Sequence, residues 1–300
     1  MKYVLVTPAR NEQAFIAKTL DSMIAQTLLP ERWVIVDDGS TDRTAEIVEP
    51  YAQRHPWIEL VRRPKHLDRS FAGKVHAFNA GLARVQALQF DVIGNLDADL
   101  SFDPDYLNFL MKKFSEDAKL GVAGTPFIEN GYDSARDSFE GQNHVAGGCQ
   151  LFRCECFQEI GGYLPNRAGG VDWIAVTTAR MKGWTTRTFT DIIYQQHRNM
   201  GEGASGKLVG RFKYGGKDYL VGNHPLWELF RIAYQMTQKP VVIGGLMIGA
   251  GYISSMVRGY PRPVSSDFIA FQHREQLRRL RNFFAEQYDV YKLHSSSISH

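Results

Sequence analysis

The chain has 300 residues, of which 44% are hydrophobic and 22% charged, a composition typical of a folded protein with a substantial core. This length fits one large α/β domain, or one domain with an appendage. A formal net charge of +3 is too small to indicate a nucleic-acid partner. The three cysteines cannot all pair and no second cluster completes a zinc site, which favours reduced, buried thiols in a cytosolic protein. Met1 and Lys2 lead directly into a strand, so no signal peptide is expected.

Strand and helix patterns alternate through the first third of the chain. Short β-branched, apolar runs predict strands, and apolar residues at helical spacing predict the helices between them. The expected strands are 3–7, 33–36, 58–61 and 92–96. The expected helices are 14–26, a second one that follows the turn after 33–36 and ends at about residue 53, and a third at 74–88. Repeated alternation predicts a parallel sheet with right-handed crossovers. No Gly-x-Gly-x-x-Gly follows the first strand, which disfavours a dinucleotide-binding domain.

Two turns carry predictions about helix starts. Gly39 permits a tight turn after the second strand, and Ser40 or Thr41 is expected to cap the helix that follows. Asp103 and Pro104 predict another start, with Asp103 as the N-cap and Pro104 in the first helical position.

Asp97 and Asp99 follow the apolar run 92–96 and are separated by one residue. Because side chains alternate along a strand, we expect both carboxylates to point the same way at the carboxyl end of the strand. Open α/β sheets bind ligands at that edge. Two carboxylates there suit a divalent cation such as Mg²⁺, which holds diphosphates through one or two such ligands. The alternative is a solvated loop.

Five segments together resemble the family 2 glycosyltransferases of GT-A fold, and the resemblance covers about residues 3–200. It implies an α/β fold with a Rossmann-like mixed sheet flanked by helices, here with a C-terminal helical appendage. It also implies inverting transfer of a sugar from a nucleotide-sugar donor, using a metal at Asp97-Ala98-Asp99. The segments are Thr7–Glu12, Val36–Asp42, Gly73–Leu82, Leu96–Asp99 and Ile160–Tyr163.

The resemblance also assigns the donor site. It implies that Asp97 faces the ribose or diphosphate, that Asp99 binds Mg²⁺ or Mn²⁺, and that Lys74 neutralises donor phosphate. A UDP-sugar is the first expectation, with GDP- and dTDP-sugars as alternatives. The alternatives for the residues are a turn role for Asp38 and a solvated position for Lys74. The nucleoside pocket would be formed by Pro8, Ala9 and Glu12, with Asp38 at the base edge.

An inverting transfer needs a base that removes the proton of the acceptor hydroxyl. Asp172 matches the second acid of the family's Glu-Asp pair and is the candidate base, although Val171 replaces the first acid. The alternative for Asp172 is a helix N-terminal carboxylate stabilised by the helix dipole. His197 is a candidate third metal ligand, with a structural role as the alternative. Asn199 replaces the Trp of the Gln-x-x-Arg-Trp signature of processive synthases, which disfavours processive synthesis.

The last third of the chain exceeds a minimal catalytic domain. Gly201–Gly216 is expected to be a mobile loop that closes over the donor, and Leu226–Gln238 is amphipathic. The uncharged segment Val241–Val257 is followed by arginines, a pattern that favours docking on an anionic membrane leaflet. A buried core helix or a homodimer interface is the alternative. The predicted organisation is a catalytic domain at 1–220, a helical region at 221–290 and a disordered tail at 291–300. The arginines are Arg258, Arg262, Arg274, Arg278, Arg279 and Arg281.

Together these features predict a glycosyltransferase that acts on a glycan or lipid-linked acceptor in polysaccharide or cell-envelope assembly, at the cytoplasmic face of the plasma membrane. One alternative is a soluble enzyme with a diffusible acceptor. The other is a non-catalytic module that binds a nucleotide-sugar.

Overall fold

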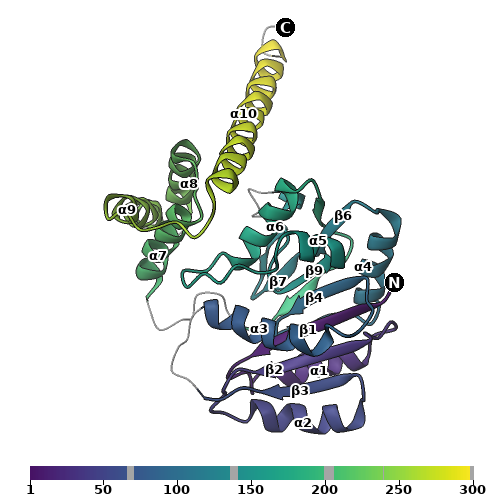
Figure 1. Ribbon diagram of the computed structural model, residues 1–300. Helices are drawn as coiled ribbons and strands as arrows, with labels where there is room; N and C mark the ends of the chain where they lie inside the picture. The colour runs from purple at the N-terminus through teal and green to yellow at the C-terminus, as the bar shows by residue number, and fades with distance from the viewer. Residues whose placement is uncertain (66–70, 136–140, 199–205, 239, 298–300) are drawn as a thin grey trace. The chain divides into compact units, whose positions relative to one another are not determined.

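The computed structural model describes residues 1–65, 71–135, 141–198, 206–238 and 240–297. The chain forms two compact units, Met1–Met200 and Gly201–His300. The first unit is an α/β structure and the second is helical (Figure 1).

A seven-stranded mixed sheet forms the centre of the first unit. Its strand order is β10-β6-β9-β4-β1-β2-β3. The strands β3, β2, β1 and β4 run parallel, whereas β9 is antiparallel to both of its neighbours, β4 and β6. The parallel arrangement expected for the first four strands and the mixed sheet implied by the family resemblance are both confirmed. The strands are β1 Tyr3–Ala9, β2 Arg32–Asp37, β3 Ile58–Arg62, β4 Val92–Leu96, β6 Leu120–Gly124, β9 Cys149–Arg153 and β10 Thr185–Thr188.

Helices cover both faces of this sheet (Figure 1). Alternate residues of β1 enter two separate cores, with Leu5 in one and Val6 in the other. The Leu5 core includes residues of α1, α2 and α4, and the Val6 core includes residues of α3, α5 and α6. At Gly81 a Cβ would lie 2.5 Å from Val6 Cγ1, so glycine lets α3 approach the sheet closely. The helices are α1 Ile16–Ile24, α2 Thr44–Arg54, α3 Phe71–Val85, α4 Tyr106–Glu116, α5 Cys154–Glu159 and α6 Val171–Met181, with a short 3₁₀ helix η1 at Gly141–Asn143.

A second, smaller sheet has the order β5-β11-β7-β8. β5 begins directly after Asp99, and β11 ends directly before His197. Because β5 and β11 pair, this sheet brings together two chain segments that lie almost a hundred residues apart. Its strands are β5 Leu100–Ser101, β7 Phe127–Glu129, β8 Tyr132–Asp133 and β11 Tyr194–Gln196.

Both predictions about helix capping are wrong. α2 begins at Thr44, where Asp42 Oδ1 accepts the Thr44 backbone N–H at 3.0 Å, because Ser40 is engaged elsewhere by the N–H of Asn11. α4 begins at Tyr106, and Asp103 instead accepts the Tyr106 N–H through its backbone carbonyl at 3.1 Å. In both places the chain makes an additional turn before the helix starts.

The second unit consists of four helices: α7 Lys207–Leu220, α8 Pro225–Thr237, α9 Ile243–Val257 and α10 Ser266–Ser297. α7 and α9 are in close contact, since a Cβ on Gly215 or Gly251 would overlap the backbone of the other helix. α7 therefore belongs to the second unit, which moves the boundary from the predicted 220 to about 200.

The structure also changes two expectations about loops and tails. Residues 207–216 of the predicted mobile loop form most of α7, while 199–205 lie outside the described residues. Residues 291–297 of the predicted disordered tail belong to α10. Among the described helices, none combines the length and apolarity needed to cross a bilayer.

Candidate functional site

The turn after β1 carries three of the predicted donor-binding residues. Ala9 is buried and Pro8 is half-buried at the end of the strand. Glu12 follows, and its Oε2 accepts a charged hydrogen bond from Arg198 Nη2 at 2.6 Å. Burial raises the pKa of Glu12 to about 7, against the lowering effect of Arg198, and the charges of Asp99 and Asp97 raise it further. Glu12 therefore lies within the same electrostatic field as the two aspartates.

The turn after β2 holds Asp38. Its backbone N–H donates to Ala9 O at 2.8 Å, which ties this turn to the end of β1, and its carboxylate pairs with Arg63. Gly39 has φ +70°, and a Cβ there would lie 2.8 Å from Pro64 O. The turn therefore requires glycine, as the sequence predicts. Asp38 is 5% exposed and lies at the carboxyl edge of the sheet, next to the turn after β1.

Asp97 and Asp99 lie in a turn, because β4 ends at Leu96. Strand alternation therefore does not orient them, and that part of the prediction is wrong. Hydrogen bonds hold Asp97 in place: its Oδ1 accepts from Lys74 Nζ at 2.6 Å and from Asn95 Nδ2 at 2.9 Å. The Asp97 backbone N–H also donates to Gly148 O at 2.8 Å. The turn is thus fixed to α3 on one side and to the chain before β9 on the other.

Asp99 is only 6% exposed. Burial and the nearby charge of Asp97 raise the pKa of Asp99 to about 6, while Lys74 and Arg198 lower it. Because the charge of Asp97 raises the proton affinity of Asp99, a divalent cation beside them would relieve the repulsion. Among the described residues no group of three or more His, Cys, Asp and Glu side chains could hold a metal. Asp97 and Asp99 nevertheless fit Mg²⁺, which takes its remaining ligands from phosphate and water.

Asp172 enters this site from the first turn of α6. Gly170, with φ +76°, precedes the helix, and a Cβ on Gly147 would lie 2.9 Å from Asp172 Cβ. Burial lowers the pKa of Lys74, but the carboxylates of Asp97, Asp172 and Asp99 outweigh it and raise the pKa overall. The charges of the predicted base and of the predicted metal ligands therefore all act on Lys74, which contacts Asp97 directly.

The structure places His197 beside Asp99, where its backbone N–H donates to Asp99 O at 2.9 Å. Both ring nitrogens have partners: Lys18 Nζ lies 3.3 Å from Nδ1, and Ser101 Oγ lies 2.8 Å from Nε2. Since an ammonium only donates, Nδ1 accepts and Nε2 carries the proton. Partial burial and the charge of Lys18 lower the pKa of His197. A neutral imidazole thus lies next to the carboxylates, and it would have to give up one of these partners to bind a metal.

Arg198 was not assigned a role by the sequence. Its guanidinium binds Glu12 and donates from Nη2 to Asn11 O at 3.0 Å, while its Nε is buried and has no acceptor among the described residues. A buried N–H without an acceptor is rare, and at this edge of the sheet it suits an anionic ligand. In the sequence, Arg198 is marked only by its place in the Gln195–Asn199 segment. Its contact with Glu12 could not be predicted, because the two residues lie far apart in the chain.

Residues 4–139 match the family model described as Glycosyl transferase family 2. Over this stretch the chain is similar to members of that family. The matched segment contains Glu12, Asp38, Lys74, Asp97 and Asp99 and ends before α6.

Curated relatives match a stretch of similar length. The poly-beta-1,6-N-acetyl-D-glucosamine synthase of Staphylococcus aureus (strain COL) is 31% identical over 121 residues, which is 40% of this chain and 27% of the synthase. The synthase of the same name from Staphylococcus epidermidis (strain ATCC 35984) is 30% identical over 122 residues, with the same shares. The match therefore spans little more than a quarter of these relatives.

Solved structures extend the likeness of fold beyond the matched segment. The mannosyltransferase PcManGT of Pyrobaculum calidifontis, in complex with GDP-Man and Mn²⁺, has a TM-score of 0.60 at 17% identity, covering 86% of this chain and 88% of that chain. TarS 1–349 of S. aureus, in complex with UDP-GlcNAc, has a TM-score of 0.57 at 16% identity, covering 87% and 74%. The fold is that of the GT-A glycosyltransferases.

Proposed function

We propose that the chain transfers a sugar from a nucleotide-sugar donor to a glycan acceptor, with inversion at the anomeric carbon. The observation that carries the proposal is the convergence of Asp97, Asp99 and Asp172 around Lys74, in a segment and fold of a glycosyl transferase family. An alternative, a non-catalytic module that binds a nucleotide-sugar, requires no carboxylate beside the metal site, and Asp172 is present there.

The donor would lie across the turns after β1, β2 and β4. Asp38 would bond the edge of the base, and Pro8, Ala9 and Glu12 would line the nucleoside pocket. Asp99, with Asp97 beside it, would hold Mg²⁺ or Mn²⁺, and the metal would neutralise charge on the departing diphosphate. Lys74 and Arg198 supply two further positive charges at this edge. To act as a third metal ligand, His197 would give up the contact of one ring nitrogen, with either Ser101 or Lys18, and bind the metal through that nitrogen.

Asp172 is the proposed base. It would accept the proton of the acceptor hydroxyl while that oxygen attacks the anomeric carbon and the diphosphate leaves. The charge of Asp172 is one of those that raise the pKa of Lys74, so the proposed base and this ammonium lie in one electrostatic field.

The donor and acceptor classes come from the relatives. TarS was solved with UDP-GlcNAc and the mannosyltransferase with GDP-Man and Mn²⁺, so a UDP-sugar is the first candidate, before GDP- and dTDP-sugars. The curated relatives are named as synthases of a β-1,6-linked N-acetylglucosamine polymer. We therefore propose a glycan or lipid-linked acceptor in the assembly of polysaccharide or cell-envelope glycan.

Donor hydrolysis in the presence of Mn²⁺ or Mg²⁺ tests the proposal directly. We expect hydrolysis of one nucleotide-sugar from a panel, its loss in excess chelator, and its loss in Asp99→Asn. Asp103→Asn is the matched control, because Asp103-Pro104-Asp105 repeats the spacing of the metal pair, yet Asp103 is exposed on a loop. Hydrolysis that survives chelation would contradict the metal role, and hydrolysis that survives Asp99→Asn would contradict the role of that residue.

The second unit supports a further part of the proposal, contact with a membrane. α9 turns its glycines inward, since Gly244, Gly245, Gly249 and Gly251 are buried. Ile248 and Tyr252 are buried with them, but several other large apolar side chains lie on the outside: Leu246 and Ile253 are exposed, and Val257 is 77% exposed. Packing inside the unit does not explain these exposed bulky residues.

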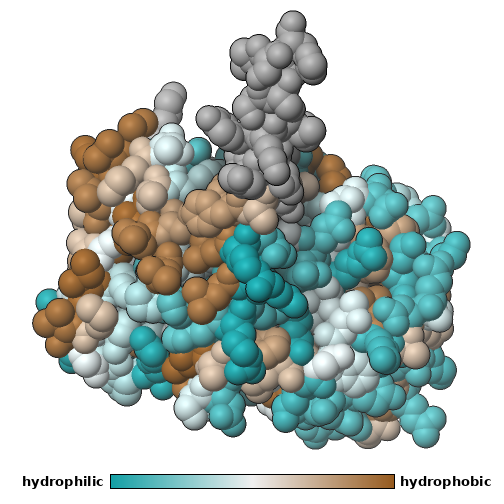
Figure 2. Space-filling model, turned by 90° about the horizontal axis from the view of Figure 1, so that it is seen from above, coloured by the Kyte–Doolittle hydropathy of each residue, from teal (hydrophilic) through white to brown (hydrophobic). Residues whose placement is uncertain are grey.

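The exposed apolar residues form one surface, which we call the α8–α9 face. Hydrophobic side chains gather at the left of Figure 2, the side on which Figure 1 draws these helices. Exposed apolar surfaces of this kind mark sites of association. Among the arginines that follow, Arg258, Arg274, Arg278 and Arg281 are exposed and suit anionic headgroups. The face consists of Leu226, Leu229, Val241, Val242, Ile243, Leu246, Ile253, Met256 and Val257.

Flotation with vesicles of increasing anionic lipid content tests this contact. We expect the full chain to float with anionic vesicles and to be partly released by salt. Replacing Leu246 and Val257 by Glu should weaken binding at least ~10-fold, since each buried apolar side chain contributes about 1.5 kcal/mol or more. Thr237→Glu, an exposed polar position on α8, is the control. No flotation of a chain that is dimeric by light scattering would instead assign the face to a homodimer interface.

A further inference from the structure

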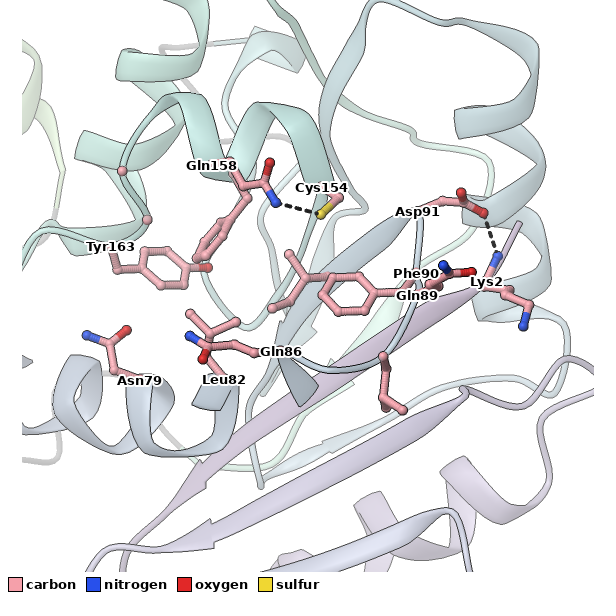
Figure 3. A pocket seen from close by; sticks show the side chains of 15 residues that line it. Lys2, Asn79, Leu82, Gln86, Gln89, Phe90, Asp91, Cys154, Gln158 and Tyr163 are labelled. Carbon is pink, nitrogen blue, oxygen red and sulfur yellow. Dashed lines mark hydrogen bonds between the residues drawn. The ribbon is translucent and has the colours of Figure 1, made fainter. Parts of the chain in front are cut away.

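A groove of about 610 Å³ lies in the first unit between α3 and α5, away from the turn that carries Asp97 and Asp99 (Figure 3). Its floor comes from the residues that lead into β4, among them Phe90 and Asp91, so it opens at the amino end of that strand. The volume falls in the range of roughly 300–1,000 Å³ that small-molecule sites occupy. None of the donor-site residues described above lines this groove.

Side-chain amides line the groove. Asn79 comes from α3, Gln86 from the turn directly after α3, Gln89 from the loop before β4, and Gln158 from α5 (Figure 3). Asn79, Gln86 and Gln89 are exposed and make no hydrogen bond to another described residue, and Gln158 makes only a long contact of 3.5 Å with Cys154 Sγ. Each amide offers two donors and an acceptor. This is the complement of a ligand with many hydroxyl groups, because each hydroxyl both donates and accepts.

The charged side chains of the groove, Asp91 and Lys2, already have a hydrogen-bond or ion-pair partner within the protein. Asp91 Oδ2 accepts the backbone N–H of Lys2 at 2.8 Å, and Lys2 Nζ lies 3.4 Å from Glu31 Oε1. A phosphate would therefore have to compete with Glu31 for the ammonium, and a cation would have to compete for Asp91. The groove is suited to an uncharged ligand.

The groove also offers apolar surface beside the amides. Phe90 and Leu82 are half-buried and line its middle, between the amides of α3 and α5 (Figure 3). The ring of a sugar has C–H groups on its faces and hydroxyls around its edge. It can therefore pack a face on an aromatic or aliphatic side chain while its edge bonds to amides.

One end of the groove approaches the catalytic carboxylates. Tyr163 lines that end, and its hydroxyl donates to Gln150 Oε1 at 2.8 Å. Burial, followed by the negative charges of Asp172 and Asp97, raises the pKa of Tyr163, so these carboxylates lie close to it. From Lys74 in the site to Val85, next to Gln86 of the groove, α3 advances by roughly 16 Å at 1.5 Å per residue. A chain of several sugars could span that distance.

We propose that the groove between α3 and α5 binds an uncharged stretch of a glycan chain, at a position remote from the residue that receives the transferred sugar. The proposal rests on the proposed glycosyl transfer, which supplies the glycan. The groove holds the chain through Gln86, Gln158 and the Phe90 ring, and it thereby retains long acceptors better than short ones.

Binding of neutral oligosaccharides to the full chain tests the proposal. The probes are chitotetraose, cellotetraose and maltotetraose, titrated in saturation-transfer NMR and calorimetry. We expect one of them to bind with a dissociation constant in the millimolar range. The double variant Gln86→Ala/Gln158→Ala should bind it roughly 30-fold more weakly, since each of the two lost hydrogen bonds contributes about 1 kcal/mol and about 1.4 kcal/mol corresponds to a factor of ten. Phe90→Leu keeps an apolar side chain but removes the ring, and it should also weaken binding.

Two controls separate this proposal from the proposed reaction. Gln53→Ala changes an exposed glutamine of α2, which covers the other face of the sheet, and should bind the probe normally. Metal-dependent donor hydrolysis should be the same in the wild type and in all groove variants, because the groove contains none of the proposed donor ligands. Failure of every probe to bind at millimolar concentration overturns the groove as a glycan site, and so does equal binding by the groove variants. Neither result affects the assignment of Asp99.

Discussion

Glu228 is the group whose protonation we expect to make the stability of the second unit depend on pH. It lies on α8 and is 1% exposed, and Asn223 Nδ2 donates to its Oε2 at 3.0 Å. Asp218 on α7 is 2% exposed and pairs with Arg231 Nη1 at 3.1 Å. Burial, followed by the charge of Asp218, raises the pKa of Glu228 to about 7. Two buried carboxyl groups therefore share one arginine, and one of them holds a proton near neutral pH.

The direction of the effect follows from this raised pKa. The folded chain binds the proton of Glu228 more tightly than the unfolded chain, whose carboxyl titrates near 4.5. This contribution to stability is fully present below that value and is lost as the pH rises to about 7. The rise in the pKa of Glu228 from 4.5 to about 7 corresponds to about 3 kcal/mol in the free energy of unfolding, at roughly 1.4 kcal/mol per pKa unit.

Glu228→Gln replaces the protonated acid by a permanently neutral group of nearly the same shape. Its amide can still accept from Asn223 and donate toward Asp218. We expect the variant to match the wild type near pH 5 and to be more stable by up to about 3 kcal/mol at pH 8. Hydrogen exchange of α8 peptides, corrected for the intrinsic pH dependence of exchange, measures the free energy of opening within the second unit alone.

Asp267→Asn is the control for this experiment, because Asp267 is exposed in the first turn of α10. It should keep the pH trend of the wild type. The reasoning is refuted if Glu228→Gln retains the full loss of stability between pH 5 and 8, because the trend would then come from other groups.

Three further predictions concern the proposed site. Asp172→Asn should bind donor normally yet lose at least ~100-fold in transfer rate, the lower end of what a placed base contributes, and a loss below about tenfold would point to another base. Arg198→Lys keeps the charge but removes the buried Nε–H, which has no acceptor among the described residues, so calorimetry should show about tenfold weaker donor binding, whereas an unchanged affinity would leave Arg198 as a structural link. His197→Gln should raise the metal concentration needed for half-maximal hydrolysis at least ~10-fold, and an unchanged requirement would mean that His197 only supports Ser101.

Much of the first half of the fold could be predicted from local pattern. The strands β1 to β4 are continuous apolar runs, because both faces of the sheet are covered, and such runs are visible in one sequence. The place of β9 could not be predicted in the same way. Its position between β4 and β6 and its antiparallel direction come from pairing with distant segments. The spacing of apolar residues within one segment does not indicate such pairing.

In the site, too, residues marked by a local pattern could be predicted, whereas contacts between distant segments could not. Asp97 and Asp99 could be found because they follow a buried strand, although they lie in a turn rather than on the strand itself. The contact of Glu12 with Arg198 joins residues 186 positions apart. This contact depends on the pairing of β11 with β5. That pairing could not be predicted, because both strands are too short and too polar to show a strand pattern in the sequence.

The central position of β9 has a consequence for how the protein is made. During synthesis β4 and β6 emerge before Cys149–Arg153, so β4 lacks its neighbour on one side for a few seconds at about 5–20 residues per second. β6 lacks both of its neighbours, because β10 emerges later still. Unpaired strand edges recruit other strands, which makes this interval prone to misassembly. A ribosome that stops at residue 139, where the family match ends, would release a chain with that gap permanently open. Such a fragment should depend on chaperones to stay in solution, and the unit becomes self-sufficient only after β9 closes its sheet.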